Sequence, residues 1–387
     1  MVPIKYNTRN LWVRRGTTLM TVAGTALIVW SSCILFSMVE GLQQSLDVSG
    51  DPLDLIILRK GSTNETDGGF ELDKADTMVT IKGVAADPKL GPLVSRELLN
   101  IPVMERANGS RTNLIIRGLD PVGRLLRRDF SIVAGRDLDP GKGEAIVSER
   151  LAGRFKNSNL GDTLKVGEKE SYRVVGLFRA GGGSAESEIW VDRKDLERNL
   201  SREGSVSSVQ IRAAGPTEFD AIKNVIVDDP QYRLLALGEK EYYAKQTQST
   251  TFLKVFGFVI AVFLTVGAMF AAANTMFGAV ASRTREIGTM RALGFSKSSI
   301  LLCFLGESVI LCSIGGIVGL LATLPLQALS FGTVNSNTFT EITVNFAFGP
   351  LVMIVAFSMT LAMGVLGGFL PAWKATDKDI IASLREL

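Results

Sequence analysis

Four long stretches of the chain are almost free of charged residues, and the charged positions are concentrated between and around them. Each stretch is longer than the roughly 18 apolar residues that indicate a membrane-spanning helix. Together they hold one formal charge, that of Glu307. The pattern predicts four transmembrane helices, with a large polar domain between the first and the second. The stretches are Thr17–Met38, Val255–Ala281, Ile300–Leu329 and Ala347–Leu370.

Lysine and arginine in the short loops predict the orientation of these helices. Residues 1–16 and the loop 282–299 each carry four such residues, whereas the connection 330–346 carries none. The positive-inside rule then places both termini and the loop 282–299 in the cytoplasm. The predicted segments are a cytoplasmic interfacial helix at 1–16, transmembrane helix 1 at 17–40, an extracytoplasmic domain at 41–250, transmembrane helix 2 with a stalk at 251–281, a cytoplasmic loop at 282–299, transmembrane helix 3 at 300–329, an outer loop at 330–346, transmembrane helix 4 at 347–371 and a cytoplasmic tail at 372–387.

The polar domain alternates short valine- and isoleucine-rich runs with amphipathic runs, which predicts a mixed α+β fold, here with two subdomains. No helix breaker occurs between Gly238 and Gly257, so the second transmembrane helix is expected to continue outside the membrane as a stalk. The predicted strands are Leu53–Leu58, Asn113–Arg117, Tyr172–Phe178, Glu188–Val191 and Ser208–Ile211, and the predicted helices are Ser148–Phe155, Asp192–Leu200 and Pro216–Val227.

Composition excludes several classes of function. The chain has no histidine, so a Ser-His-Asp triad and a histidine-ligated metal site are excluded. Its three cysteines, Cys33, Cys303 and Cys312, all lie in apolar stretches, which argues against a disulfide framework. A net charge of +3 is too small to indicate a nucleic-acid partner. We therefore expect a membrane protein that is not an enzyme, with no catalytic residue, cofactor or metal ion in this chain.

The loop after the second transmembrane helix has the pattern of a short amphipathic helix. Ile287, Met290 and Leu293 follow i, i+3, i+6 spacing, and Gly294 suits the end of a helix. Read from the residues alone, this segment is equally a solvated connector whose arginines extend toward the membrane surface.

Three pieces of sequence closely resemble the FtsX-like permease family, which includes the MacB, LolC/LolE and FtsX transmembrane subunits of type VII ABC transporters. They are the opening Arg9-Asn-Leu-Trp-Val-Arg-Arg-Gly-Thr-Thr-Leu19, the loop Ala281–Ile300 and the ending Leu370-Pro-Ala-Trp-Lys-Ala-Thr376. The resemblance implies that the loop is a coupling helix that docks on an ATPase and passes its motion to the outer domain, a mechanism called mechanotransmission. The positions that match the coupling pattern are Arg283, Arg285, Glu286, Ile287, Gly288, Arg291, Leu293 and Gly294. Of these, Arg285, Glu286 and Arg291 are expected to make polar contacts with the ATPase, and Ile287 and Leu293 apolar ones.

The resemblance implies a permease of the bacterial inner membrane that drives export or extraction of a lipoprotein, peptide, antibiotic or lipid. The chain contains no Gly-x-x-x-x-Gly-Lys-Ser/Thr motif, so ATP and Mg are expected on a separate ABC ATPase subunit. The implied partners are that ATPase, a second permease subunit (a second copy or a paralogue) and an adaptor on the outer side. The alternative is an FtsX-like scaffold that activates an extracytoplasmic cell-wall hydrolase.

Inside the predicted transmembrane helices, five residues are expected to serve packing. Glu307 is expected to face the helix bundle or to reach basic groups at the inner face. The pairs Gly315/Gly319 and Gly364/Gly368 allow helices to approach closely, either within one subunit or between subunits. Pro325 is expected to kink the third transmembrane helix and Pro371 to end the fourth.

Overall fold

The computed structural model describes residues 15–166, 170–334 and 340–377, so most of the predicted interfacial helix at 1–16 and of the tail at 372–387 lies outside it. The chain divides into two compact units. The helical unit contains the described residues up to Gly41 together with Thr251–Leu329 and the described residues from Asn345 onward. The second unit, which we call the inserted domain, contains Leu42–Thr250 and the described part of Ser330–Val344.

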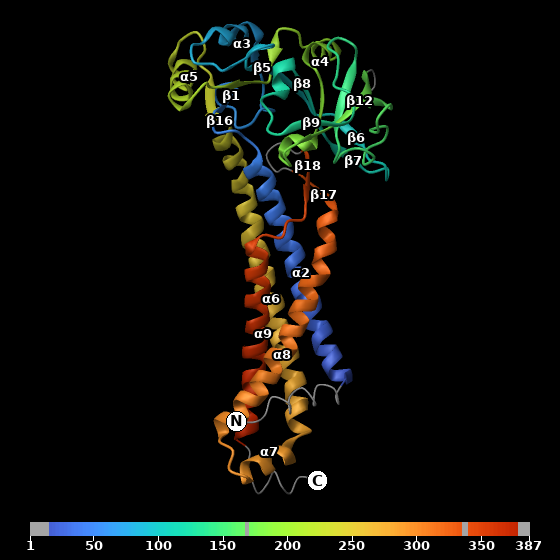
Figure 1. The fold of residues 1–387 in the computed structure, drawn as a ribbon, viewed down its shortest axis with the longest axis vertical. Helices are drawn as coiled ribbons and strands as arrows, with labels where there is room; N and C mark the ends of the chain where they lie inside the picture. The colour runs from blue at the N-terminus through green and yellow to red at the C-terminus, as the bar shows by residue number, and fades with distance from the viewer. Residues whose placement is uncertain (1–14, 167–169, 335–339, 378–387) are drawn as a thin grey trace. The chain divides into compact units, whose positions relative to one another are not determined.

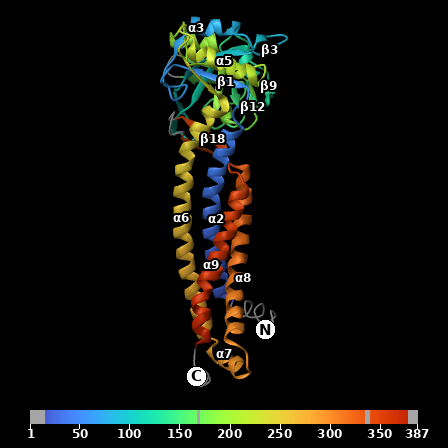
Figure 2. The same cartoon turned by 90° about the vertical axis from the view of Figure 1, so that its left-hand side faces the viewer.

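Four long helices make up most of the helical unit (Figures 1 and 2). Each has the length and apolar composition needed to cross a membrane. They pack around a shared core to which α2 contributes Cys33 and Phe36, α6 Ala268, and α9 Val352 and Met363. The helices of this unit are α2 (Arg15–Val48), α6 (Glu239–Ala281), α7 (Thr284–Ala292), α8 (Lys297–Thr323) and α9 (Pro350–Thr376), with a 3-10 turn η4 (Leu324–Ala328) after α8.

The two prolines behave differently from the sequence expectation. The α-helical part of α8 ends at Thr323, and Pro325 lies in the 3-10 turn η4, so this proline follows the end of the helix instead of kinking it. Pro371 was expected to end the last helix, but α9 continues through it to Thr376. Membrane helices tolerate proline because packing against neighbours and small local adjustments compensate for the missing N–H.

The small residues of α8 and α9 are contact points between helices of one chain. A Cβ at Gly315 would collide with the Thr25 hydroxyl of α2, and one at Gly319 would lie 2.5 Å from the Ala26 carbonyl oxygen. Gly364 and Gly368 approach α8 in the same way, with 2.8 Å to Val309 Cα and 2.5 Å to Ser308 Cβ. The described residues therefore use all four of these glycines for packing within the subunit.

The inserted domain is built on one large mixed sheet (Figure 1). Its strand order is β11-β12-β10-β13-β8-β5-β15-β1-β16, and β9 pairs with β12 beyond the end of β11. The pairs β10–β12 and β8–β13 are parallel. The strands of this sheet are β1 (Asp54–Leu58), β5 (Val94–Asn100), β8 (Ile115–Leu119), β9 (Phe130–Gly135), β10 (Glu144–Ser148), β11 (Thr163–Val166), β12 (Glu170–Ala180), β13 (Glu188–Asp192), β15 (Ser208–Arg212) and β16 (Leu235–Gly238).

Shorter elements complete the inserted domain. The helices α3, α4 and α5 pack on the sheet, and four two-stranded ribbons lie outside the main strand order. Their bounds are α3 (Leu72–Thr77), α4 (Arg193–Leu200), α5 (Pro216–Asp228), β2 (Phe70–Glu71) with β14 (Ser205–Val206), β3 (Ala86–Asp87) with β4 (Gly91–Pro92), β6 (Val103–Glu105) with β7 (Arg111–Asn113), and β17 (Ser330–Val334) with β18 (Glu341–Asn345); the 3-10 turns are η1 (Met78–Thr80), η2 (Pro121–Arg124) and η3 (Ser184–Ser187).

Instead of two separate subdomains, the single sheet carries two principal apolar cores. One core joins Leu55 and Ile57 of β1 to Ile222 and Ile226 of α5. The other surrounds Val147 of β10 and includes Leu196 of α4. On the opposite face of β1, Ile56 and Leu58 pack with Tyr242 of α6. This last cluster fixes the beginning of α6 to the sheet.

Two of the three helices predicted for this domain are confirmed, because Asp192 and Pro216 lie at the starts of α4 and α5 as expected. The third predicted helix is wrong. The Asp192 side chain accepts a hydrogen bond from the Asp195 N–H at the start of α4, and Pro216 is the first residue of α5. The segment Ser148–Phe155, predicted as a helix, forms the end of β10 followed by turns. Gly153 there has φ +72°, a left-handed conformation that interrupts any helix.

Candidate functional sites

The short helix α7 is anchored on one face and exposed on the other. Ile287 is buried in an apolar cluster with Met276 and Val280 of α6, Phe304 of α8 and Ala372 of α9. After α7 the chain turns at Gly294, with φ +92°, and Ser296 caps α8 by accepting a hydrogen bond from the Ser299 N–H at 3.2 Å. The ends of three long helices therefore fix the position of α7.

The residues predicted to contact an ATPase separate into two groups. Arg285 and Glu286 are exposed, and the Leu293 side chain is 73% exposed although it is apolar. Arg291 is half-buried, and Gly288 is buried with Ile287. Because Ile287 is only 2% exposed, its predicted contact with a partner is replaced by packing inside the chain.

Arg283 also has a partner within the chain. Its guanidinium forms a bidentate ion pair with Glu307 of α8, with N–O distances of 2.8 and 3.2 Å. Both residues are buried, and the guanidinium carbon lies 5.9 Å from the centre of the Phe304 ring. The sequence correctly suggested that Glu307 reaches a basic group. Arg283 therefore fixes the loop after α6 to α8.

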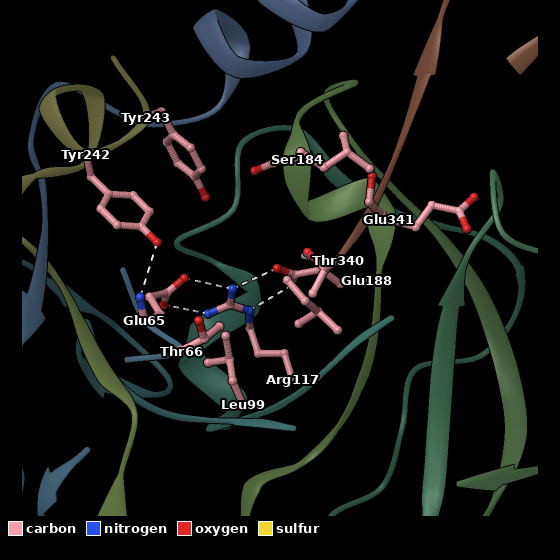
Figure 3. Close-up of a pocket in the computed structure, with 13 residues that line it drawn as sticks. Glu65, Thr66, Leu99, Arg117, Ser184, Glu188, Tyr242, Tyr243, Thr340 and Glu341 are labelled. Atoms are coloured by element: carbon pink, nitrogen blue, oxygen red, sulfur yellow. Dashed lines mark hydrogen bonds and ion pairs between the residues drawn. The ribbon is translucent and has the colours of Figure 1, made fainter. Parts of the chain in front are cut away.

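The inserted domain contains a second arrangement of buried charge, centred on Arg117 of β8 (Figure 3). All five guanidinium N–H groups of Arg117 are used. It forms bidentate hydrogen bonds to Glu188 of β13, both at 2.7 Å, and to Glu65, at 2.8 and 3.0 Å. Its fifth bond, of 2.6 Å, goes to Glu97 of β5. We call these four residues the arginine centre.

Neighbouring groups complete the arginine centre. Arg127 donates to both oxygens of Glu97 at 2.8 and 3.0 Å, and the Ser208 hydroxyl donates to Glu65 at 2.6 Å. Burial by itself would raise the pKa of Glu65, but the charge and hydrogen bonds of Arg117 outweigh it and lower this pKa to about 2. The carboxylate of Glu65 is therefore ionised at neutral pH.

The cavity beside the arginine centre is small. Its volume is about 40 Å³, and Tyr242, Tyr243 and Thr340 are among the residues that line it (Figure 3). A space of that size holds one or two water molecules, whereas small-molecule sites occupy roughly 300–1,000 Å³. The arginine centre therefore joins β5, β8 and β13, and the cavity beside it is smaller than a typical small-molecule site.

The connection between α8 and α9 is bound into the inserted domain chiefly through Glu341 and Thr343. Glu341 of β18 is 1% exposed and accepts hydrogen bonds from Arg106, at 3.0 and 2.5 Å, and from Arg154, at 2.7 Å. Arg154 also donates to the Thr343 hydroxyl at 2.7 Å, and the Thr343 N–H donates to Ser187 at 2.9 Å. A segment that connects two membrane-spanning helices is thus part of the other unit.

The first residue of α6, Glu239, carries a buried carboxylate with neutral partners. It accepts hydrogen bonds from the Asp51 N–H at 2.8 Å and from the Gln210 side chain at 2.7 Å. Within the described residues it forms no ion pair. Burial raises the pKa of Glu239 to about 7, and it also raises that of the neighbouring Asp54 to about 6, against the opposing effect of Arg212.

Comparison with known proteins identifies the family. Residues 258–380 match the FtsX-like permease C-terminal family, and residues 18–228, more than half of the chain, match the MacB-like periplasmic core domain. The chain belongs to the FtsX/MacB-type permeases. This membership makes the inserted domain a periplasmic domain and places the permease in the bacterial inner membrane.

Curated relatives of the permease are exporters by name. A macrolide export ATP-binding/permease protein MacB from Mannheimia succiniciproducens is 24% identical over 95% of this chain and 58% of the relative. A pyoverdine export ATP-binding/permease protein PvdT from Pseudomonas entomophila is 25% identical over 97% of this chain and 58% of the relative. The permease thus spans somewhat more than half the length of these relatives. Among solved structures, the periplasmic region of MacB from Actinobacillus actinomycetemcomitans aligns with a TM-score of 0.39 and 12% identity, covering 54% of this chain and 97% of that one.

Sequence reasoning missed the arginine centre and the Glu341 contact. The predicted strand Asn113–Arg117 overlaps β8 only from Ile115 onward. Arg117 is a charged residue inside this buried strand, and such a residue requires partners. Glu341 is the only charged residue of the connection 330–346. Both signals indicate a buried ion pair, but neither identifies the partner residue.

The raised pKa of Glu239 predicts an unusual pH dependence of stability. An unfolded glutamate has a pKa of about 4.3, so the folded domain binds a proton more strongly than the unfolded chain between that pH and about 7. The free energy of unfolding should therefore rise by about 1–3 kcal/mol as the pH falls from 8 to 5.5. Thermal melting in neutral detergent measures this, with Trp190 as the reporter after the other three tryptophans are replaced by Phe.

Two variants test this pH dependence. Glu239→Gln removes this titrating group and should leave only the smaller rise in stability that the raised pKa of Asp54 causes at the acidic end of the range, while stabilising the domain at pH 8. The amide at position 239 can donate to Gln210 Oε1, which lacks a partner in the described structure, once the Gln210 amide flips. Glu241→Gln, two residues further on, is the control, because Glu241 is exposed and paired with Lys245. If the free energy of unfolding changed with pH equally steeply in Glu239→Gln and in the unmodified protein, Glu239 would not be the source of the pH dependence.

Proposed function

We propose that this permease is the membrane subunit of an ATP-driven exporter, in which an ABC ATPase docks on α7 and its motion reaches the periplasmic domain by mechanotransmission. The observation that carries the proposal is the continuity of α6. This helix runs unbroken for 43 residues, roughly 65 Å, from Glu239 in the periplasmic domain to Ala281, directly before the loop that carries α7. A rigid element of this length transfers displacement at one end to the other.

The exposed surface of α7 supports docking of a partner. Leu293 is a large apolar side chain that faces solvent in a basic loop, next to the exposed charges of Arg285 and Glu286. Apolar anchors bordered by charged groups are typical of protein interfaces. The basic loop and the positive-inside rule support a cytoplasmic position for α7 and both termini. ATP and Mg would bind to the ATPase, and an ABC ATPase dimer calls for two permease subunits.

The proposed substrate class is inferred from the names of the relatives. Those named above export macrolides and pyoverdine, so we propose a substrate taken from the periplasmic side, such as an antibiotic, a peptide, a lipid or a lipoprotein. The MacB-like match of the periplasmic domain favours export over the alternative of an FtsX-like activator of a cell-wall hydrolase. An adaptor protein on the periplasmic side would extend the route along which the substrate is exported.

Disrupting the exposed face of α7 should separate the permease from its ATPase. We expect the double variant Arg285→Glu/Leu293→Asp to retain less than a tenth of the ATPase that co-purifies from native membranes in mild detergent. Its thermal melting should be unchanged, because both side chains are exposed. Ser298→Asp, an exposed position in the same loop, is the control and should retain the ATPase. Equal recovery of ATPase with both variants, or none with the unmodified chain even in a non-hydrolysable nucleotide, would contradict docking on α7.

The same preparation distinguishes the two functions. Export is supported if energised membrane vesicles accumulate a labelled macrolide or peptide when they contain the unmodified protein, but not when they contain the double variant Arg285→Glu/Leu293→Asp. A cell-wall hydrolase recovered in equal amount with the periplasmic domain, without any transport, supports the activator instead.

A further inference from the structure

The periplasmic domain contains a second, much larger pocket, whose lining residues are all different from those of the cavity beside the arginine centre. Its volume is about 510 Å³, within the range of small-molecule sites. Five basic side chains line it, from the end of β1, from α3, and from the turns before β14 and β16. They are Arg59, Lys60, Lys74, Arg202 and Arg233.

Four of these five cations have no partner of their own. Lys74 pairs with Glu71, the only carboxylate in the lining, at 2.9 Å. Within the described parts of the chain, the side chains of Arg59, Lys60, Arg202 and Arg233 form neither an ion pair nor a hydrogen bond. Most arginines of this domain are paired, for example those at positions 96, 154 and 212. Among the described residues of this domain, five arginines form no ion pair, and three of them, Arg59, Arg202 and Arg233, line this pocket.

The floor of the pocket is apolar and aromatic. Phe70, Tyr232 and Leu234 line it and are 8%, 6% and 6% exposed. The Tyr232 hydroxyl donates no hydrogen bond to any described residue. Arg233 has φ +47°, a left-handed conformation that is unfavourable for a residue with a side chain. Like charges held close around a hollow cost free energy unless an anion neutralises them.

We propose that this pocket binds a small organic anion that carries two or more carboxylate or phosphate groups on an apolar or aromatic body. The guanidinium groups of Arg59, Arg202 and Arg233 bind such groups in a bidentate manner, and Lys60 adds a point charge. The aromatic floor contacts the body of the ligand. All residues of this site belong to the periplasmic domain. The proposal that the site binds an anion therefore does not depend on whether an ATPase docks on α7.

Calorimetric titration of the full chain in non-ionic detergent tests the proposal, with benzene-1,3,5-tricarboxylate as the probe. We expect a dissociation constant of roughly 0.1 mM at low salt, and binding at least tenfold weaker for benzoate, which has one charge on the same ring. The double variant Lys60→Gln/Arg202→Gln should weaken binding of the tricarboxylate at least tenfold. Both side chains are exposed, so the variant should melt at the temperature of the unmodified protein.

A matched control separates the pocket from general surface charge. Lys89→Gln/Arg111→Gln removes the same two charges from exposed positions outside the pocket and should change the affinity less than twofold. The proposal is overturned if the tricarboxylate does not bind at millimolar concentration, if benzoate binds as tightly, or if the two double variants weaken binding equally. Citrate, which lacks the ring, should bind more weakly than the aromatic tricarboxylate because it leaves the floor uncovered.

Discussion

Replacing Arg117 with Met should destabilise the periplasmic domain by about 3–5 kcal/mol at pH 7.5, enough to unfold much of it in a domain of ordinary stability. The methionine fills much of the same space but donates no hydrogen bond. Glu65 and Glu188 then remain buried, at 7% and 5% exposure, without an ion-pair partner, and Glu97 keeps only Arg127. An uncompensated buried charge costs far more than the net value of an ion pair.

The pH dependence of this defect follows from the same charges. In the unmodified protein Arg117 holds the pKa of Glu65 down at about 2, so the stabilisation from this carboxylate is fully present above about pH 4.5 and is lost only as the pH falls further. Without Arg117, burial raises the pKa of the carboxyl group, and the folded state takes up protons more readily than the unfolded chain. The deficit relative to the unmodified protein, measured at the same pH, should therefore shrink between pH 7.5 and pH 5.

Melting followed by Trp190 fluorescence measures the effect directly, because this residue is fully buried and donates a hydrogen bond to Glu188 at 2.9 Å. Arg128→Met is the control, since Arg128 is exposed and lies 3.7 Å from an exposed Asp129. Adding Gln at positions 65 and 188 to the Arg117→Met chain should restore much of the lost stability, because it removes the two carboxylates left without an ion pair, whereas Glu97 keeps its ion pair with Arg127. A variant that melts like the control at pH 7.5 would show that the arginine centre is dispensable.

The parts of this fold that the sequence predicts correctly depend on local patterns. The four membrane-spanning helices follow from uncharged stretches longer than 18 residues, and α4 and α5 follow from Asp192 and Pro216 at their starts. In each case the decisive residues lie within or beside the element itself. The continuation of α6 before its apolar stretch depends on a local pattern as well, because the helix begins at Glu239, directly after the last glycine before a long stretch without breakers.

The parts that the sequence does not predict depend on contacts between distant positions. The missed strands β5 and β10 each contain a carboxylate that is buried, Glu97 within β5 and Glu144 at the start of β10. Each is neutralised by an arginine elsewhere, Glu97 by Arg117 and Arg127, and Glu144 by Arg136. A polar residue in a strand is consistent with burial only when its partner is known, and the partner is set by the sheet order.

Replacing Glu341 with Gln should release the segment between α8 and α9 from the periplasmic domain while leaving that domain folded. The substitution keeps the shape of the side chain but removes the charge that Arg106 and Arg154 share. Charge-assisted hydrogen bonds to a fully buried carboxylate are worth roughly 1.5–3 kcal/mol each, so a loss of about 2–3 kcal/mol of local stability is expected. The two arginines keep access to water at 29% and 25% side-chain exposure, which limits the cost of leaving them unpaired.

Hydrogen exchange of the peptide that contains β18 measures this release. We expect its amides, including the Thr343 N–H that donates to Ser187, to exchange about 30- to 150-fold faster, whereas those of β1 and β15 keep their protection. Glu105→Gln is the control, because Glu105 pairs only loosely, at 3.6 Å, with the exposed Lys156. Unchanged protection of β18 in Glu341→Gln would show that backbone contacts alone hold this segment. Faster exchange with reduced ATP-driven transport would instead identify the Glu341 contact as a further connection, besides the continuous helices α2 and α6, through which membrane helices act on the periplasmic domain.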